Sequence, residues 1–514
     1  MRSGPRNPYL ADSGNAMAHG RCDQQDNTPG RGPEGPTEVL GPDGIQYAPL
    51  GPGHFGGLIS GRYPDGRRVI WSNGRQTIAK LDYDTLEVLA TLPTGTEPIT
   101  DQAELDVLEA GLDDLEGDDA VAHAITIAAR FMTGLDGVYS LLDRDHTLFL
   151  GRKDHVASYI EVDPEDPASP IVERDRWYRP DGIEGYFVGI NITFDGRLVT
   201  TTDQGWVVCL ARDFSDYQAV QLPGAASAAA DHCARKAAEY GHTSYGWVRT
   251  STCTGDDGGI YVISVDTVHK VIWTGERLSV DPADGAWSAR YRNSSGDGSG
   301  TTPSLMGFGP EEDRFVVIGD GDDVVNITLL WRDAIPEDWQ PLPGAPSRRI
   351  AGMGPAHMGD PARTEIKTEQ SVTVSGYGAM TVNNEPASRP GGWPATRARL
   401  FSFFLGHKPE YTPYGLHKYE WDPAERRLRE AWVNTGVSSP NSVPFVAQES
   451  DLVYTCGTRD GRWTIEAVDW TTGESRFHYV VGGSRYNTLG GGVTVDDDGR
   501  LLYGTIFGKA RILR

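Results

Sequence analysis

Cysteine is scarce in this sequence of 514 residues, and its five occurrences are scattered along the chain. The count is odd and no C-x-x-C pair occurs, so a disulfide framework is not indicated and a reducing compartment is favoured. No run of about 18 apolar residues is present, which argues against a transmembrane helix. The first twenty residues also lack the apolar core of a secretory signal. We therefore expect a soluble protein of the cytoplasm.

Positive charge is also in short supply. Lysine and arginine together number 47 against 72 aspartates and glutamates, which gives a formal net charge of −25 and a pI near 4.8. Such a surface repels phosphate backbones and anionic lipid headgroups. We expect no nucleic-acid partner and no membrane partner, and composition leaves the oligomeric state open.

Several well-known catalytic motifs are missing as well. The sequence contains no Walker loop, no nucleophile elbow and no zinc-binding helix motif. Without a visible covalent nucleophile, any reaction is expected to use polar acid–base groups or a metal ion, as in hydrolysis, hydration or isomerisation. A divalent metal is therefore one cofactor to consider.

Glycine, in contrast, is abundant. Its 63 occurrences make up about 12% of the chain, against about 7% in average proteins, and many stand in turn dipeptides between apolar runs. Asp65-Gly66 separates one pair of such runs and Asp195-Gly196 another. Asp-Gly between alternating hydrophobic residues is a strong hairpin signal. The chain therefore consists mainly of short antiparallel strands joined by tight turns.

The strands recur in eight similar units. The units start at intervals of roughly 40–80 residues and each opens a set of about four strands, which is the signature of a β-propeller. The last unit, from Gly490, has only three strands, and one strand is left over near residues 44–50. We predict an all-β, eight-bladed propeller whose ring is closed by this N-terminal strand, with a seven-bladed ring as the alternative.

Two stretches interrupt the strand pattern. Residues 101–134 and 225–240 carry apolar or alanine-rich helical patterns and are predicted to be helical insertions. Residues 1–42 lack periodicity and are predicted to be irregular. The domain prediction is thus an irregular segment at 1–42 followed by a single propeller domain at 43–514.

One turn carries a family resemblance. Asp469-Trp470-Thr471-Thr472-Gly473-Glu474 resembles the Asp-x-x-Thr-Gly-Glu turn of the pyrroloquinoline-quinone-like propeller repeat, and residues 81–87 are a looser match in which Leu86 replaces the glycine. The resemblance implies the quinoprotein-like propeller superfamily, whose members include dehydrogenases and assembly scaffolds. It makes pyrroloquinoline quinone a second cofactor to consider. Many dehydrogenases of that superfamily carry adjacent cysteines near the quinone, and no two cysteines are adjacent here.

Ligand groups in a propeller come from the innermost strands and the loops that lead into them. Polar residues at these places are the candidate ligand-binding residues, although crowded inner strands also favour small polar side chains for packing. The candidates are Gln25, Asn191, Thr301, Thr302, Asn383, Asn441, Tyr486 and Asn487.

Histidine is the natural acid–base group near neutral pH. His54 and His242 fall near strand starts and are predicted to be catalytic. The polar segment 19–29 stands before the closing strand, where a propeller needs no such residues. One hypothesis is that it crosses the channel mouth and presents His19, Gln25 and Asp26 to a ligand, and the alternative is a disordered tail.

These patterns lead to one functional prediction with two alternatives. The chain is expected to bind a small organic molecule in its central channel and to act on it by acid–base or metal-assisted chemistry. The alternatives are a quinone-dependent dehydrogenase and a non-catalytic scaffold for protein interactions, which should carry a large exposed patch on one face.

Overall fold

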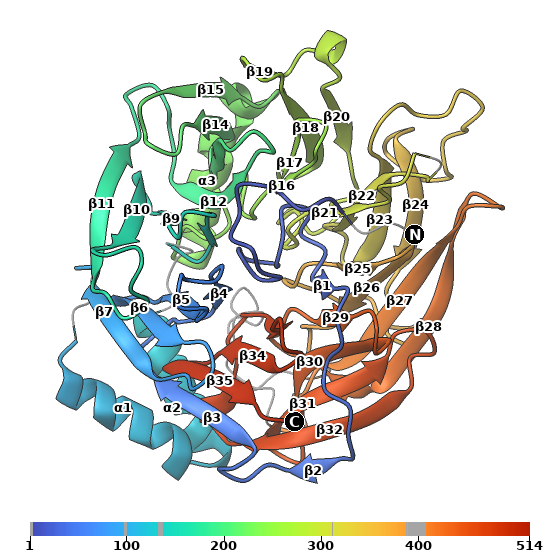
Figure 1. The fold of residues 1–514 in the computed structure, drawn as a ribbon. Coiled ribbons are helices and arrows are strands. Elements are labelled where there is room, and N and C mark those ends of the chain that lie inside the picture. Colours follow the sequence, from blue (N-terminus) through green and yellow to red (C-terminus); the bar gives the residue numbers. More distant parts are fainter. Residues whose placement is uncertain (1–3, 97–99, 132–136, 311, 387, 389–407) are drawn as a thin grey trace.

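Eight sheets surround a central channel, and they are antiparallel except where two short N-terminal strands add in parallel to the seventh (Figure 1). The computed structural model describes residues 4–96, 100–131, 137–310, 312–386, 388 and 408–514. The eight-bladed propeller predicted from the repeats is confirmed. The first four blades contain β4 (Leu58–Ile59), β5 (Val69–Asn73), β6 (Thr77–Asp82) and β7 (Val88–Pro93); β8 (Ser140–Leu142), β9 (Leu148–Gly151), β10 (His155–Glu161) and β11 (Ile171–Tyr178); β12 (Phe187–Ile192), β13 (Leu198–Thr202), β14 (Trp206–Leu210) and β15 (Tyr217–Gln221); and β16 (Cys253–Thr254), β17 (Gly259–Ile263), β18 (Thr267–Trp273), β19 (Leu278–Ser279) and β20 (Trp287–Arg290).

The next three blades continue in chain order. They contain β21 (Ser304–Met306), β22 (Phe315–Gly319), β23 (Asn326–Trp331) and β24 (Ile350–Pro355); β25 (Thr373–Ser375), β26 (Gly378–Val382), β27 (Tyr414–Asp422) and β28 (Arg427–Ser438); and β29 (Phe445–Ala447), β30 (Leu452–Arg459), β31 (Arg462–Asp469) and β32 (Ser475–Gly482), to which β1 (Asn27–Thr28) and β2 (Glu38–Val39) add. Blade 7 therefore has six strands.

The two ends of the chain meet in blade 8. Its strands are β33 (Val493–Val495), β34 (Leu501–Gly504), β35 (Gly508–Ile512) and, outermost, β3 (Ile45–Pro49). β3 pairs antiparallel with β35 from Ile45 opposite Ile512 to Pro49 opposite Gly508. Ring closure by the N-terminal strand is thus confirmed. It matters physically because it covers the edge that a three-stranded last blade would leave open.

Tight turns join the first two strands of four of the blades. The glycines of the Asp-Gly dipeptides lie between the first two strands of blades 1, 3, 4 and 8, and they are left-handed, with φ of +86° at Gly66 and +91° at Gly196. A residue without Cβ adopts this conformation at little steric cost. The quinoprotein-like turn behaves in the same way, since Gly473 has φ of +77° and Leu86, at the corresponding place in blade 1, has φ of +58°.

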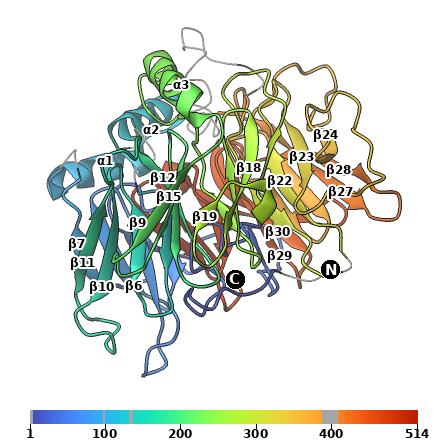
Figure 2. The same ribbon diagram turned by 90° about the horizontal axis from the view of Figure 1, so that it is seen from above.

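Three helices lie on one face of the ring (Figure 2). They are α1 (Gln102–Asp114), α2 (Gly117–Phe131) and α3 (Ala225–Tyr240), so both predicted helical insertions are found and the first contains two helices. α2 buries Val121, Ala124, Ile127 and Phe131, a helical spacing that packs one face onto the ring. No helix in the described part of the chain is long and apolar enough to cross a membrane.

The chain before the first blade enters the channel from the opposite face (Figures 1 and 2). We call residues 4–28 the channel segment. Its main-chain carbonyls accept hydrogen bonds from the innermost strands of successive blades. Donor and acceptor pairs include Ile59 to Asn15, Leu142 to Ala16, Thr254 to Cys22, Leu305 to Asp23, Val374 to Gln25 and Val446 to Asp26, all at 2.7–3.0 Å.

Side-chain hydrogen bonds connect the channel segment to the two remaining blades, 3 and 8. In blade 3, Asn191 Nδ2 donates to the carbonyl of Cys22 at 3.3 Å, and Asn7 Nδ2 donates to the carbonyl of Thr193 at 3.0 Å. In blade 8, Asn15 Nδ2 donates to the carbonyl of Val495 at 2.9 Å. The channel segment is therefore an integral part of the ring with contacts to all eight blades, and the disordered-tail alternative does not hold.

Candidate functional site

A cavity of about 560 Å³ lies in the channel between the channel segment and the helices. Its floor is formed by Asn15, Met17, Ala18, His19 and Asp26. Across from the floor, the cavity is bounded by Ile125, Ala128 and Ala129 of α2 and by Tyr240 and His242 at the end of α3. The volume falls within the range of small-molecule pockets, roughly 300–1,000 Å³.

His19 and Asp26 form an ion-pair contact in the floor. Nδ1 of His19 lies 2.9 Å and 3.0 Å from the two carboxylate oxygens of Asp26. The two side chains are 10% and 4% exposed. Because an ionised carboxylate can only accept, Nδ1 carries the proton of this contact and Nε2 has the lone pair when the ring is neutral. Within the described residues, no protein group is hydrogen-bonded to Nε2.

Both residues of this pair have a left-handed backbone. The φ angles are +62° at His19, +56° at Gln24 and +56° at Asp26. Residues other than glycine adopt this conformation rarely, and it persists only where the surroundings impose it. Here the side-chain amide of Gln24 donates to the carbonyls of Ala18 at 3.1 Å and Arg21 at 2.8 Å. These contacts hold the loop in the shape that brings His19 onto Asp26.

The burial of the pair disfavours an isolated charge on either side chain. Burial raises the pKa of the Asp26 carboxyl, and the neighbouring His19 only partly offsets that rise. The ring of Tyr139 stacks on the imidazole, with centroids 6.3 Å apart and planes inclined by 30°. The pKa of Tyr139 is raised by burial, while hydrogen bonding to Thr302 and the Ser251 backbone opposes the rise. His19 is thus held by a carboxylate at one edge and an aromatic face beside it.

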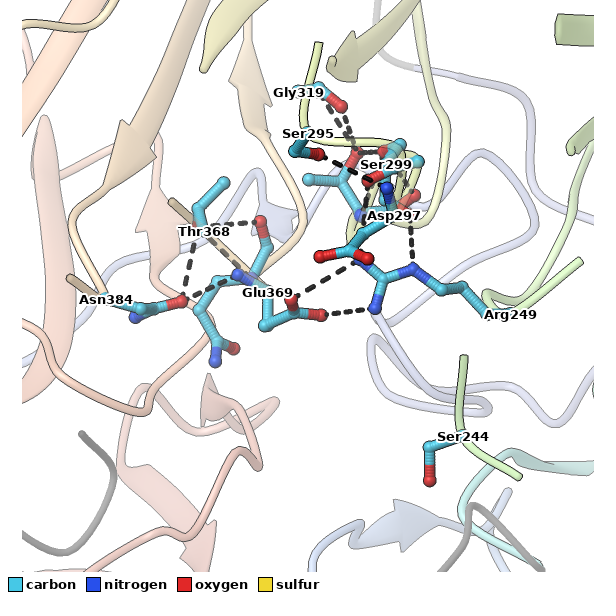
Figure 3. A network of polar contacts seen from close by, with 12 residues as sticks. Ser244, Arg249, Ser295, Asp297, Ser299, Gly319, Thr368, Glu369 and Asn384 are labelled. Atoms are coloured by element: carbon cyan, nitrogen blue, oxygen red, sulfur yellow. Dashed lines mark hydrogen bonds and ion pairs between the residues drawn. The ribbon is translucent and has the colours of Figure 1, made fainter. Parts of the chain in front are cut away.

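A second polar centre lies on the wall between blades 4 and 6 (Figure 3). Arg249 Nη1 donates to Glu369 Oε2 at 2.9 Å, and Nε donates to the carbonyl of Ser299 at 3.0 Å. The backbone N–H of Glu369 donates to Asn384 Oδ1 at 2.7 Å, which fixes the position of this residue. Charge-assisted contacts of this kind are stronger than neutral ones. The pair provides a guanidinium and a carboxylate in fixed positions at the cavity wall.

Aromatic rings extend this centre toward α3. The guanidinium of Arg249 lies 4.6 Å from the centroid of Tyr245, and Tyr245 stacks on Tyr240 at 4.1 Å. The hydroxyl of Tyr240 donates to Asp297 at 3.0 Å, and Lys236 of α3 also pairs with Asp297. The end of α3 is thereby fixed to the loop before blade 5, so this wall of the cavity is preformed.

Three of the four predicted catalytic residues line the cavity, namely His19, Asp26 and His242. Nδ1 of His242 accepts from the backbone N–H of Ser244 at 3.3 Å. His54 does not line the cavity. Its two ring nitrogens contact the hydroxyls of Ser72 at 2.9 Å and Thr77 at 3.0 Å, and burial lowers its pKa to about 3. The position of His54 is that of a structural residue, which holds blade 1 together.

The predicted ligand-binding residues lie one layer away from the cavity. Gln25 and Asn191 use their amides on main-chain carbonyls and thereby hold the channel segment. Thr302 lies beside Tyr139, and its backbone N–H donates to Ser371. The others bond within the ring or, in the case of Tyr486, pack on Tyr47: Thr301, Asn383, Asn441, Tyr486 and Asn487. None of the eight is among the residues that line the cavity.

Sequence reasoning missed the second polar centre. Arg249 directly precedes Thr250 and Ser251 in the loop that leads into blade 4, and Glu369 occupies the loop that leads into blade 6. Loops of this kind are the places where a propeller supplies ligand groups. A charged residue in such a loop is itself a signal, because charges are seldom buried unless they are paired. This signal could have identified Arg249 and Glu369 as candidate site residues.

The cofactors considered above can be compared with these residues. Among the described residues, no group of three or more His, Cys, Asp and Glu side chains gathers as a metal site would require. Pyrroloquinoline quinone is a tricarboxylate, and in the described part of the cavity wall Arg249 is the one guanidinium or ammonium group, already paired with Glu369. The described residues therefore do not fit the quinone.

Comparison with known proteins establishes a family. No family model matches the chain. A protein of Archaeoglobus fulgidus, described as uncharacterised, is 30% identical over 519 residues, covering 99% of this chain and 89% of the archaeal protein. This chain belongs to the same family as the archaeal protein. Because the match covers 99% of this chain, it includes the channel segment as well as the blades.

Several solved structures align with large parts of this chain at low identity. A europium-containing methanol dehydrogenase gives a TM-score of 0.47 at 11% identity, over 97% of this chain and 90% of that one. BamB from Moraxella catarrhalis gives 0.39 at 12% identity, over 71% and 95%. A streptogramin B lyase gives 0.38 at 8% identity, over 92% and 98%. The propeller that the resemblance to the quinoprotein-like repeat implied is confirmed by the eight sheets of this structure.

Proposed function

We infer that this protein is an enzyme that binds a small organic molecule in the channel cavity and moves a proton on it with His19. The observation that supports this inference is the pairing of His19 with Asp26 at the floor of a pocket-sized cavity. The reaction class is hydrolysis, hydration or isomerisation, each of which requires a positioned acid–base group.

His19 is the acid–base group of this proposal. Its Nε2 lone pair accepts a proton from water or from the bound molecule, and the same nitrogen returns the proton in a later step. Asp26 keeps the proton on Nδ1 and stabilises the imidazolium that forms. Tyr139 restricts rotation of the ring by stacking on it. Asp26 and Tyr139 are therefore positioning residues in this scheme.

Arg249 and Glu369 are the binding groups of the proposal. Both line the cavity, and both are held by main-chain and side-chain contacts before any ligand arrives. A guanidinium and a carboxylate side by side offer donors and acceptors to one polar group of a ligand. The apolar remainder of the wall, including Ile125, Ala128 and Leu489, then covers the body of the molecule.

The test compares wild-type protein with His19→Ala on a small-molecule extract from the source cells, followed by mass spectrometry. We expect wild type to convert at least one compound that His19→Ala leaves unchanged. A product heavier by one water indicates hydration, fragments that sum to such a mass indicate hydrolysis, and an unchanged mass with deuterium taken up from D₂O indicates isomerisation.

A matched control comes from a second His–Asp pair. Nδ1 of His155, the first residue of β10, lies 2.7 Å from Oδ1 of the preceding Asp154, and neither residue lines the cavity. His155→Ala should convert the same compounds as wild type. Equal conversion by wild type and His19→Ala, or no conversion by wild type, would contradict the proposal.

A further inference from the structure

Five glycines line one side of the cavity, among larger residues such as Phe55 and Leu489. Gly56 and Gly57 directly precede β4 of blade 1, Gly490, Gly491 and Gly492 directly precede β33 of blade 8, and all five line the cavity. We call them the glycine wall. In a ring of eight blades, blade 8 lies opposite blade 4, whose leading loop carries Arg249. The glycine wall therefore lies across the cavity from the polar centre.

Three of these glycines have a structural reason to be glycine. Gly490 has φ of +91°, a conformation that side chains disfavour. A Cβ on Gly57 would lie 3.2 Å from Leu502 Cδ2, and a Cβ on Gly491 would lie 3.2 Å from the Thr488 carbonyl. Packing within the protein explains these positions without a ligand.

Gly56 and Gly492 have no such reason. Their φ angles lie outside the left-handed region, a Cβ on Gly56 would meet no atom within 4 Å, and a Cβ on Gly492 would lie 3.7 Å from Val443 Cβ, an ordinary contact. Alanine at either position would fit the fold and would reduce the freedom of the unfolded chain. Both residues line the cavity, and the position of a Cβ on Gly56 is open space.

A second observation points to a ligand in the same space. The His19 side chain is 10% exposed and lines this cavity, and within the described residues no protein group is hydrogen-bonded to its Nε2. Because the protein does not bond this nitrogen, its hydrogen bond is left to a water molecule or to a ligand in the cavity.

We propose that Gly56 and Gly492 are glycines because a flat, ring-bearing organic ligand lies against their backbone, with its polar edge toward Arg249 and Glu369. The proposal rests on the proposed function of the cavity and specifies the class of molecule that it takes. Glycine is used where a backbone and a ligand approach closely, since a bare strip of main chain is flatter than any side-chain surface.

The probe for the test is N-phenyl-1-naphthylamine, an uncharged ring compound whose fluorescence rises in an apolar environment. An uncharged probe avoids repulsion by the net charge of −25. Wild type should bind it saturably, and Gly56→Ala and Gly492→Ala should each bind about tenfold or more weakly, because one methyl group overlaps the ligand. Both variants should melt at or above the wild-type temperature.

Gly41→Ala is the matched control. A Cβ at Gly41 also meets no atom within 4 Å, and Gly41 does not line the cavity, so this variant should bind the probe like wild type. Failure of wild type to bind the probe, or unchanged binding by Gly56→Ala and Gly492→Ala, would overturn the proposal. The His19→Ala variant separates the two inferences, since loss of conversion there tests the acid–base role whatever the glycine variants do.

Discussion

Asp26 holds Nδ1 of His19 within 3.0 Å of both its carboxylate oxygens, while its own main-chain carbonyl is bonded to the innermost strand of blade 7 at 2.9 Å. The residue that orients the imidazole is thus part of the contact that ties the channel segment to the ring. Placement of the candidate base therefore depends on closure of the channel by that segment.

Replacing Asp26 with asparagine should reduce activity while the fold is retained. Asparagine tolerates the left-handed backbone that Asp26 adopts, with φ of +56°. Its amide cannot stabilise an imidazolium and can favour the wrong tautomer, so we expect a loss of roughly 10²–10⁴-fold in kcat. Turnover of the compound that wild type converts is the measurement. A variant with wild-type kcat would show that Asp26 does not support the base.

Replacing Gln25 with methionine should loosen the channel segment. Gln25 Nε2 donates to the Leu305 carbonyl at 2.7 Å, and its Oε1 accepts from Asn27 at 3.1 Å. Methionine keeps the length and removes both hydrogen bonds, while Asn27 Nδ2 keeps its bond to the Val374 carbonyl at 2.7 Å, so we expect a cost of about 1–3 kcal/mol. Faster hydrogen exchange and proteolysis of residues 4–28 should follow. Unchanged exchange in that segment would mean that other contacts alone hold it in place.

Replacing only one partner of the Arg249–Glu369 pair should destabilise the protein more than replacing both. The two side chains are 9% and 19% exposed, so Arg249→Met removes the guanidinium partner of a largely buried carboxylate, which costs roughly 3 kcal/mol. The double variant Arg249→Met/Glu369→Gln should recover part of this loss in urea unfolding. The control is Arg31→Met, because Arg31 pairs with Glu34 on the surface with both side chains more than half exposed. Its midpoint should match wild type, and a double variant no more stable than Arg249→Met would contradict the account.

Lys509 should give the stability a recognisable pH dependence. It is fully buried behind the glycine wall, donates to the carbonyls of His54 and Gly56, and burial lowers its pKa from 10.5 to about 7. Between these values the unfolded chain binds a proton that the native state has released, so native stability rises with pH, by at most about 1.4 kcal/mol per pH unit.

The measurement for Lys509 compares wild type with Lys509→Met in urea at pH 7, 8 and 9. The free energy of unfolding of wild type should increase relative to the variant across this range, whatever the absolute difference between the two. Parallel pH curves would show that the lysine keeps its charge in the folded protein.

The fold was predictable because its signals are local. An Asp-Gly turn such as Asp195-Gly196 indicates the strands on either side of it, and the alanine-rich run of α3 indicates a helix. Both signals lie within a few residues of the element that they predict. The leftover strand at 44–50 also predicted closure of the ring, since the last unit lacked one strand.

The site was only partly predictable. His19 and Asp26 stood out because a polar segment precedes the closing strand without a structural need. Arg249 and Glu369 are 120 residues apart and meet only because the ring brings the loops of blades 4 and 6 to the same channel. The predicted polar candidates do not line the cavity; those with amides use them within the ring and on the channel segment, as Asn191 shows.

The most direct test of the central claim is the tautomer and occupancy of His19, read from the ring nitrogens in a long-range ¹H–¹⁵N NMR spectrum at pH 8.5. The His19 signals are assigned by their absence in His19→Gln. We expect a proton on Nδ1, none on Nε2, and a shift of the Nε2 resonance when N-phenyl-1-naphthylamine is added. A proton on Nε2 with Nδ1 bare, or resonances that the bound probe leaves unchanged, would contradict a cavity-facing base held by Asp26.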